Sequence, residues 1–258
     1  MKVGILTYHR SNNVGAVLQN YALQQVLNKY GVENETIDYK CDFIEQNNRI
    51  LFGKNLKANL KKLIELNTLI KREHKFKEFR KKYLLISPKV YSQSSIQNSN
   101  EIYDLFISGS DQVWNMKLNR EDYNYFLKFV KDDSKKIAYA ASFGYSVIPN
   151  EYEENTLNYL NKFKYISVRE KQSKELLANY NIKSDVVLDP TLLLDSNKWE
   201  KIIKNLNIKK KFIFIYMVAY TPEILNDAIK YGKKNNYDVY CMHYNYKNFN
   251  NVKNVRSV

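Results

Sequence analysis

The chain has 258 residues, of which 44% are hydrophobic and 26% are charged, and its formal net charge is +14. These values fit a soluble protein of one large or two small domains with an apolar core. Only 7 residues are glycine, and the closest pair, Gly4 and Gly15, is 15 − 4 = 11 positions apart. This spacing excludes a glycine-rich phosphate loop and the dinucleotide-binding fingerprint, because both need glycines a few positions apart.

Cysteine content and hydropathy indicate the compartment. The two cysteines, Cys41 and Cys241, are 241 − 41 = 200 positions apart, which predicts neither a disulfide framework nor a cysteine metal site. The first ten residues contain too short an apolar run for a signal peptide, and the longest apolar run, residues 212–220, is too short to cross a bilayer. We therefore expect a cytoplasmic protein.

The first elements in chain order predict a β-α-β unit. Residues 2–7 form an apolar run that predicts a buried strand, and residues 15–30 place apolar side chains at helical spacing. Gly31 follows as a helix-terminating residue, and residues 35–39 predict a second strand. A parallel sheet with a right-handed crossover is the expected result.

Residues 49–89 hold much of the excess positive charge. They contain 13 Lys and Arg against 3 Asp and Glu, a net of 13 − 3 = +10. Apolar residues at spacings of three and four predict two amphipathic helices, or one long broken helix, with the basic residues facing solvent. Such a segment could face nucleic acid, an anionic membrane or a charged substrate, although lysine is abundant throughout the chain. Residues 87–88 are expected to end this region, and residues 91–100 to form a loop.

Four further strands are predicted, and each runs into a polar cluster. The strands cover residues 103–108, 136–140, 164–168 and 186–188, and a helix over residues 171–180 follows the third of these. Ligands of open α/β sheets bind at the carboxyl ends of the strands. The polar residues that follow these strands are therefore expected to form a common site.

The remainder predicts a second domain. Residues 1–195 are expected to form an N-terminal α/β domain with the basic helical insertion at about 49–89, and residues 196–211 a linker with a short helix. Residues 212–217 and 237–241 predict strands, joined by a helix that starts with a Thr-Pro-Glu cap at 221–223. Two strands and one helix bury too little to fold alone, so we expect residues 212–258 to be the start of a truncated second α/β domain.

Nucleophilic and metal chemistry have little support. There is no Gly-x-Ser-x-Gly elbow, and no His or Asp pair has metal-ligand spacing. Of the three histidines, His74 is expected on the surface and His243 in a loop. His9 lies just after the first strand, where it is either a site residue or a loop residue without a role.

Three clusters remain that suit an anionic ligand. Asn13 and Gly15 begin the first helix, whose free N–H groups attract anions, or Asn13 is only a cap. Residues 109–115 combine hydrogen-bonding groups with a tryptophan that forms either a sugar-stacking wall or part of the core. Arg169 is a cation at a strand end that can bind carboxylate or phosphate in a bidentate way, or else pairs with Glu170.

These clusters resemble the motifs of the polysaccharide pyruvyl transferase family. The resembling segments, in the family's order, are Asn-Val-Gly-Ala-Val-Leu-Gln-Asn-Tyr-Ala-Leu-Gln at 13–24, Gly-Ser-Asp-Gln-Val-Trp-Asn at 109–115, Tyr-Ala-Ala-Ser-Phe-Gly at 139–144, Ser-Val-Arg-Glu at 167–170 with Ser173, and Val-Leu-Asp-Pro-Thr at 187–191. The resemblance implies a Rossmann-like parallel-sheet domain followed by an incomplete second one, as in B-type glycosyltransferases. It also implies transfer of a pyruvyl group from phosphoenolpyruvate to sugar hydroxyls, as a ketal, in cell-surface polysaccharide synthesis.

The resemblance also implies residue roles. Arg169 is expected to clamp an anionic group of the donor, and Asp111 or Glu170 to orient or deprotonate the acceptor hydroxyl. The substrate-binding residues are expected to be Asn13, Gly15, Gln19, Gly109, Ser110, Gln112, Trp114, Asn115, Ser142, Phe143, Gly144, Ser173 and Asp189. No metal or other cofactor is implied, since phosphoenolpyruvate is a substrate.

The chain departs from the family pattern in two places. Val14 stands where an aromatic residue is common, and the family's Ser-Phe-His-like motif, whose histidine is thought to be catalytic, has no counterpart here. The general acid is therefore expected outside this chain.

The expected partners are phosphoenolpyruvate and a sugar or lipid-linked oligosaccharide acceptor, with peripheral contact of the basic segment to an anionic membrane and no nucleic acid. The alternatives are a nucleotide-sugar-dependent glycosyltransferase and a non-enzymatic module that binds anionic surfaces.

Overall fold

The chain folds into two compact units, residues 1–201 and 202–258, and each is described by itself. The computed structural model describes residues 1–41, 43–44, 56–203, 208–217, 219, 221–243 and 255–257, with the backbone alone for 56–65, 67–69, 243 and 255–257. The boundary between the units falls within the segment 196–211 that the sequence predicts as a linker.

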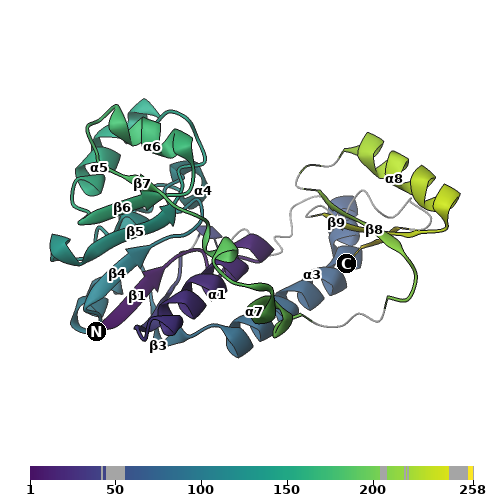
Figure 1. Ribbon diagram of the computed structural model, residues 1–258, viewed down its shortest axis with the longest axis horizontal. Coiled ribbons are helices and arrows are strands. Elements are labelled where there is room, and N and C mark those ends of the chain that lie inside the picture. Colours follow the sequence, from purple (N-terminus) through teal and green to yellow (C-terminus); the bar gives the residue numbers. More distant parts are fainter. Residues whose placement is uncertain are drawn as a thin grey trace. The chain divides into compact units, whose positions relative to one another are not determined.

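The first unit is built on a seven-stranded parallel sheet (Figure 1). Its strands are β1 (Lys2–Leu6), β2 (Glu33–Tyr39), β3 (Ile86–Tyr91), β4 (Leu105–Ser108), β5 (Lys136–Ala141), β6 (Tyr165–Val168) and β7 (Asp185–Val186). Its α-helices are α1 (Val14–Lys29), α3 (Leu56–Tyr83), α4 (Met116–Asn119), α5 (Asn150–Leu160), α6 (Lys171–Ala178) and α7 (Ser196–Glu200). Four short 3₁₀ helices are η1 (Ile96–Glu101), η2 (Tyr123–Phe126), η3 (Asp133–Lys135) and η4 (Pro190–Leu192).

The strand order, β3-β2-β1-β4-β5-β6-β7, is that of a Rossmann-like sheet. The chain moves outward from β1 to β2 and β3, and then returns to the other side of β1 to place β4. The predicted fold class is therefore confirmed. The reversal puts the carboxyl ends of β1 and β4 side by side at a topological switch point, where ligands of such sheets bind.

Local sequence explains the first helix well. The Asn13 side chain caps α1 by accepting a hydrogen bond from the Ala16 amide at 3.2 Å. After the helix, Gly31 takes a φ of +70°, a conformation that glycine adopts without a Cβ penalty. Leu23 of α1 packs with Val3, Ile5 and other buried residues, which joins the helix to the sheet.

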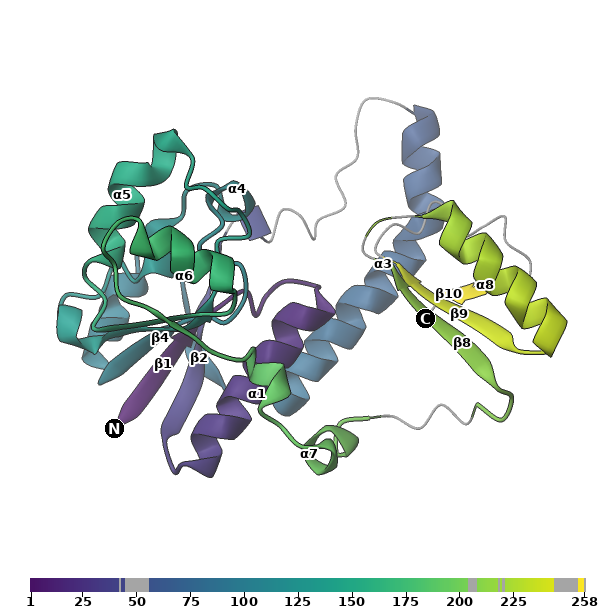
Figure 2. The same ribbon diagram turned by 45° about the horizontal axis from the view of Figure 1, so that its top comes forward.

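The basic segment differs in detail from its prediction. Its residues 56–83 form one continuous helix, α3, while residues 49–55 lie outside the described residues. Figures 1 and 2 both show α3 beside α1, and the ring of Tyr21 lies 6.3 Å from that of Phe79 and 6.2 Å from that of Tyr83. Contact with α1 therefore fixes one face of this helix.

The segment after α3 corrects the sequence prediction. Residues 87–88, expected as an end signal, lie inside β3, and the 3₁₀ helix η1 occupies part of the expected loop. Proline is tolerated in β3 because this strand is at the edge of the sheet, where one side needs no ladder hydrogen bond. At this irregular point the Asp38 amide donates to the Ser87 hydroxyl at 2.9 Å.

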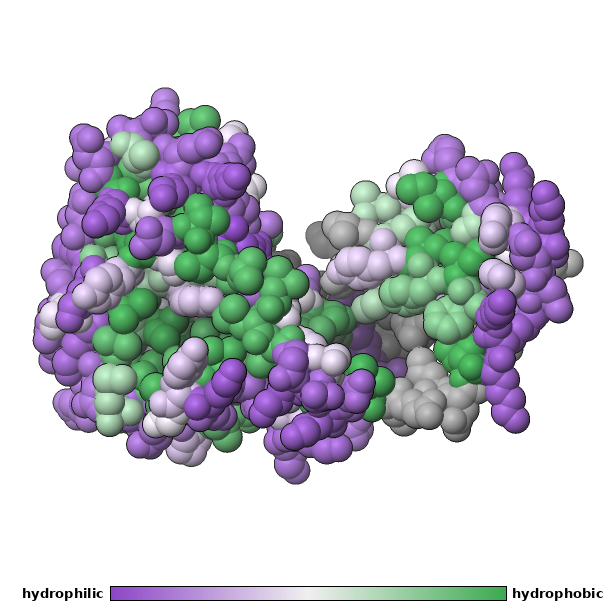
Figure 3. Space-filling model, in the orientation of Figure 1, coloured by the Kyte–Doolittle hydropathy of each residue, from purple (hydrophilic) through white to green (hydrophobic). Residues whose placement is uncertain are grey.

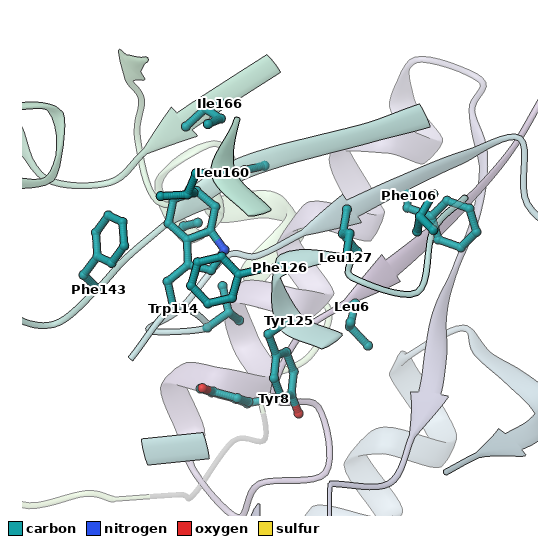
Figure 4. Packing of buried hydrophobic residues seen from close by; sticks show 14 of the residues in the cluster. Leu6, Tyr8, Phe106, Trp114, Tyr125, Phe126, Leu127, Phe143, Leu160 and Ile166 are labelled. Atoms are coloured by element: carbon teal, nitrogen blue, oxygen red, sulfur yellow. The ribbon is translucent and has the colours of Figure 1, made fainter. Parts of the chain in front are cut away.

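The largest buried side chain, Trp114, centres the main apolar cluster. Its ring stacks on Phe126 with centroids 5.5 Å apart and also contacts Phe143 (Figure 4). A further ring contact is made with Phe163. This cluster supports the loops that follow β4 and β5, because those loops contribute the rings themselves.

The second unit is a smaller parallel sheet of order β10-β9-β8 with one described helix. Its elements are β8 (Phe212–Met217), α8 (Pro222–Asn235), β9 (Asp238–His243) and β10 (Val255–Ser257). Ile215 and Met217 pack with Leu225 of α8. The strand β10 was missed, because a three-residue strand is defined by pairing with β9 rather than by its own pattern.

Among the described residues, no helix combines the length and apolarity needed to cross a bilayer. Figure 3 shows polar and apolar residues together on the visible face of both units.

Candidate active site

The candidate site begins at the switch point of the large sheet, where the loops after β1 and β4 are joined. The Thr7 hydroxyl donates to the Ser110 carbonyl oxygen at 2.9 Å, and the Tyr8 hydroxyl donates to the Gln112 carbonyl oxygen at 3.0 Å. The side-chain amide of Gln19, in α1, donates to Thr7 Oγ1 at 2.9 Å. Gln19 is buried, so its side chain holds the loop after β1 in place and does not face a ligand.

The loop after β4 is also joined to the loop after β5. The Ser142 amide donates to the Asp111 carbonyl oxygen at 3.0 Å, and the Trp114 amide donates to the Ser142 carbonyl oxygen at 3.2 Å. The Asn115 side-chain amide donates to Gln112 Oε1 at 3.0 Å, just beside Gly144. These bonds fix the backbone on which the predicted residues stand.

The close approach of the loops after β4 and β5 requires two glycines. Gly109 has a φ of +110°, and a Cβ there would collide with the carbonyl oxygen of Tyr139. Gly144 has a φ of +69°, and a Cβ there would meet the side chains of Gln112 and Asn115. Positive φ and close contact together restrict both positions to glycine.

A charged cluster lies at the ends of β6 and β7. Arg169 Nε donates to Glu170 Oε1 at 2.9 Å, and Arg169 Nη1 donates to Asp189 Oδ2 at 3.1 Å. The Ser110 hydroxyl donates to Asp189 at 3.3 Å, which connects this cluster to the loop after β4. Burial opposes the charge of Arg169, but the bonds to both carboxylates outweigh it and raise the pKa of the guanidinium. Arg169 is therefore held in place, and the pairing with Glu170 that the sequence left open as an alternative is present.

Asp111 is the carboxylate of this cluster with an unused oxygen. Its backbone is left-handed, with a φ of 89°, and Oδ1 accepts from the Gln112 amide at 2.7 Å. Within the described residues, Oδ2 accepts no hydrogen bond. Burial raises the pKa of Asp111, while the Gln112 amide and the charge of Arg169 act in the opposite direction.

Glu170 is engaged at both oxygens. Oε1 accepts from Arg169, and Oε2 accepts from the Ser173 hydroxyl at 3.2 Å. With Asp111 and Asp189 ionised as well, the cluster holds three carboxylates and one guanidinium, a local charge of 1 − 3 = −2. Such a site suits hydroxyl binding and proton withdrawal, whereas an anion can approach it only through Arg169.

Several predicted site residues are structural. Trp114 and Phe143 are both fully buried, so the expectation that Trp114 borders a sugar is wrong. The physical reason is that the surrounding rings enclose the indole from several elements. Asn13 caps α1, and neither it nor Gly15 contacts the charged cluster in the described contacts. Ser142 is buried and its hydroxyl accepts from the Gly144 amide at 3.2 Å.

A second group of polar residues at this edge contains His9, for which the sequence left a site role open, and also Arg10 and Asp38, which were not predicted. His9 is buried, and its Nε2 lies 2.9 Å from Asp38 Oδ1, while Arg10 Nε donates to the same carboxylate at 2.7 Å. Burial opposes ionisation of Asp38, but these hydrogen bonds lower its pKa to about 2. Asp38 lies in β2, one residue before the strand ends, so the carboxyl-end rule could have found it.

The helix α3 reaches the same loop. Arg72 donates to the Asn12 carbonyl oxygen, and Arg80 donates to the Asn12 side chain at 3.3 Å. The Glu73 carboxylate accepts a hydrogen bond from the side-chain amide of Asn12. The basic segment therefore helps to fix the loop after β1, a role that its composition alone did not indicate. In the described parts of the chain, no group of three or more His, Cys, Asp or Glu could hold a metal ion.

Fold and site define the class of protein. The first unit is a Rossmann-like α/β domain that brings a buried acid, a fixed arginine and hydroxyl groups together at the carboxyl edge of its sheet, where ligands of such sheets bind.

Comparison with known families gives the particular family. A model of the family described as polysaccharide pyruvyl transferase matches residues 13–257, nearly the whole chain, and the chain therefore belongs to this family. The resemblance found in the sequence is confirmed, and the family assigns the protein to the transferases. No curated protein and no solved structure matches the chain significantly.

Proposed function

We propose that this protein transfers a pyruvyl group from phosphoenolpyruvate to hydroxyl groups of a saccharide acceptor and forms a ketal in cell-surface polysaccharide synthesis. Family membership supports the reaction type. The single structural observation that supports the assignment of roles is that Asp111, which has a free carboxylate oxygen, lies within the electrostatic influence of the guanidinium of Arg169, which Glu170 and Asp189 hold in place.

The reaction needs a proton at the methylene carbon of phosphoenolpyruvate, which makes the neighbouring carbon electrophilic. One acceptor hydroxyl adds to that carbon and loses its proton, and a second hydroxyl then displaces phosphate and loses its own proton. The products are a cyclic ketal and inorganic phosphate. We assign proton withdrawal from the attacking hydroxyl to Asp111, because both oxygens of Glu170 are already bonded.

Arg169 is assigned to the donor. Two of its nitrogens, Nε and Nη1, bond to Glu170 and Asp189, and Nη2 has no hydrogen-bond partner among the described residues. This nitrogen can donate to the carboxylate or phosphate of phosphoenolpyruvate. The side chain of Arg169 is 27% exposed, so a ligand at the sheet edge can reach it.

The test is phosphate release from phosphoenolpyruvate with a panel of saccharide acceptors, with ketal formation followed by NMR. Asp111→Asn should lower kcat by roughly 10²–10⁴-fold while phosphoenolpyruvate still binds, because only the base is lost. Arg169→Ala should mainly raise the KM for phosphoenolpyruvate. Asp185→Asn and Lys174→Ala are matched controls, because both side chains are exposed and outside the cluster.

Ligand stabilisation separates this proposal from a nucleotide-sugar glycosyltransferase. A ligand that binds the folded protein raises its melting temperature. Stabilisation by phosphoenolpyruvate and not by uridine diphosphate supports pyruvyl transfer. The reverse result, or unchanged kinetics in Asp111→Asn, would count against the assignment.

A further inference from the structure

A hollow in the first unit has a lining that includes none of the residues of the charged cluster. It has a volume of about 210 Å³ and is lined by the segment that follows β3 and by the segment from Glu121 to Phe129. Its lining includes Gln93, Gln97, Glu121, Tyr123, Lys128 and Phe129. None of these residues belongs to the family motifs found in the sequence.

The base of this hollow is fixed by buried hydrogen bonds. Asp122 lines it and accepts from the Tyr39 hydroxyl at 2.5 Å and from the Asn124 amide at 3.1 Å. The Asn124 side chain donates in turn to the Tyr39 hydroxyl at 2.9 Å. Tyr39 is the last residue of β2, so these bonds connect the hollow to the same edge of the sheet as the charged cluster.

The rim carries hydrogen-bonding groups that are not used within the protein. In the part of the chain that the structure describes, the side chains of Gln93, Gln97, Glu121 and Lys128 have no hydrogen bond or ion pair. Together they offer amide donors and acceptors, a carboxylate acceptor and an ammonium donor. Four such groups around one hollow suit a ligand that has several hydroxyl groups.

Charge and size narrow the class of ligand. The hollow has two carboxyl groups, on Glu121 and Asp122, and one ammonium group, on Lys128, so it has no net positive charge that would select an anionic ligand. The rings of Tyr123 and Phe129 supply an apolar wall against C–H groups of a ligand. Because the hollow is smaller than the roughly 300–1,000 Å³ of pockets for drug-sized ligands, it has room for a single sugar ring.

We propose that this hollow is a carbohydrate subsite, which holds one sugar unit of the acceptor away from the reacting hydroxyls. The inference rests on the proposed function for the identity of the acceptor. A sugar unit bound at the ends of β2 and β3 would fix which part of a longer saccharide reaches Asp111.

Direct binding of small glycosides tests the subsite without an assay of enzyme activity. The probes are methyl glycosides of glucose, galactose and N-acetylmannosamine, observed by saturation-transfer NMR. Replacing Gln93 and Gln97 together by alanine removes two hydrogen-bonding groups, so at least one glycoside should bind about tenfold or more weakly. Asn158→Ala, which removes an exposed amide on α5, should leave binding unchanged.

The Arg169→Ala variant separates the two proposals. Glycoside binding that survives in Arg169→Ala and is lost in the double variant supports the subsite, even if no acceptor is pyruvylated. In the active enzyme the double variant should raise the KM for oligosaccharide acceptors and leave kcat and the KM for phosphoenolpyruvate unchanged. Absence of binding by all three glycosides at tens of millimolar, or equal binding by the wild type and the double variant, would overturn the proposal.

Discussion

Asp38→Asn tests the buried polar group after β1. Asp38 accepts hydrogen bonds from Arg10 Nε at 2.7 Å and Nη2 at 3.0 Å, lies 2.9 Å from His9 Nε2, and its side chain is 17% exposed. Its pKa falls from 3.8 to about 2. Each unit of pKa corresponds to roughly 1.4 kcal/mol, so the ionised carboxylate stabilises the fold by about 2 kcal/mol.

The sign of the pH dependence follows from the lowered pKa. The stabilisation by Asp38 is complete well above pH 3.8 and is lost as the pH falls through about 2. Asparagine has the shape of the protonated acid, so the variant should be less stable than the wild type by about 2 kcal/mol at pH 7. The difference should shrink below pH 4, to about 1 kcal/mol at pH 3.

The assay is urea unfolding followed by tryptophan fluorescence. Both tryptophans, Trp114 and Trp199, lie in the unit formed by residues 1–201, so the signal reports the unit that contains Asp38. Asp185→Asn removes an exposed carboxylate of the same unit and should change stability by less than about 0.5 kcal/mol. A difference for Asp38→Asn that is equally small at pH 7, or that is the same at pH 3 as at pH 7, would refute this reasoning.

Three further predictions concern the core, the loop contacts and the base. Trp114→Ala should destabilise the first unit by about 3–5 kcal/mol, because the ring is fully buried against Phe126. Urea unfolding followed by far-UV circular dichroism measures this loss of stability, and a loss below about 1 kcal/mol would contradict the prediction. Gly109→Ala should cost more than Gly144→Ala, because a Cβ at 109 meets a backbone oxygen whereas one at 144 meets the ends of side chains. Equal melting temperatures would be inconsistent with that difference. In the dependence of kcat on pH, the acid limb should lie above pH 3.8, because burial raises the pKa of Asp111. The kcat should rise as the pH passes through that pKa and Asp111 loses its proton. The Asp111→Asn variant should lack this acid limb.

The contrast between Trp114 and Arg169 shows where sequence reasoning reached its limit. Both stand in motifs that the sequence marked, and both were expected to contact substrate. Burial of Trp114 depends on Phe126, Phe143 and Phe163, which come from different loops and cannot be paired with it from spacing. The partner Asp189 lies twenty residues after Arg169 and reaches it only because β7 pairs with β6.

The contacts that were missed have a similar explanation. His9 and Asp38 are 29 positions apart, and Asn12 and Arg80 are 68 positions apart. Their contacts depend on the parallel pairing of β1 with β2 and on the position of α3 beside α1. Neither follows from the composition of the basic segment.

The amino-acid sequence alone determined the parallel α/β sheet, the first helix with its cap at Asn13 and its end at Gly31, and the polar clusters after the strands. These features depend on short-range periodicity, capping and backbone preference, which neighbouring residues decide. Only the tertiary structure decided which polar side chains face a ligand and which support the loops. That choice depends on strand order and burial, because contacts between residues far apart in the chain set the charge, the pKa and the exposure of each group.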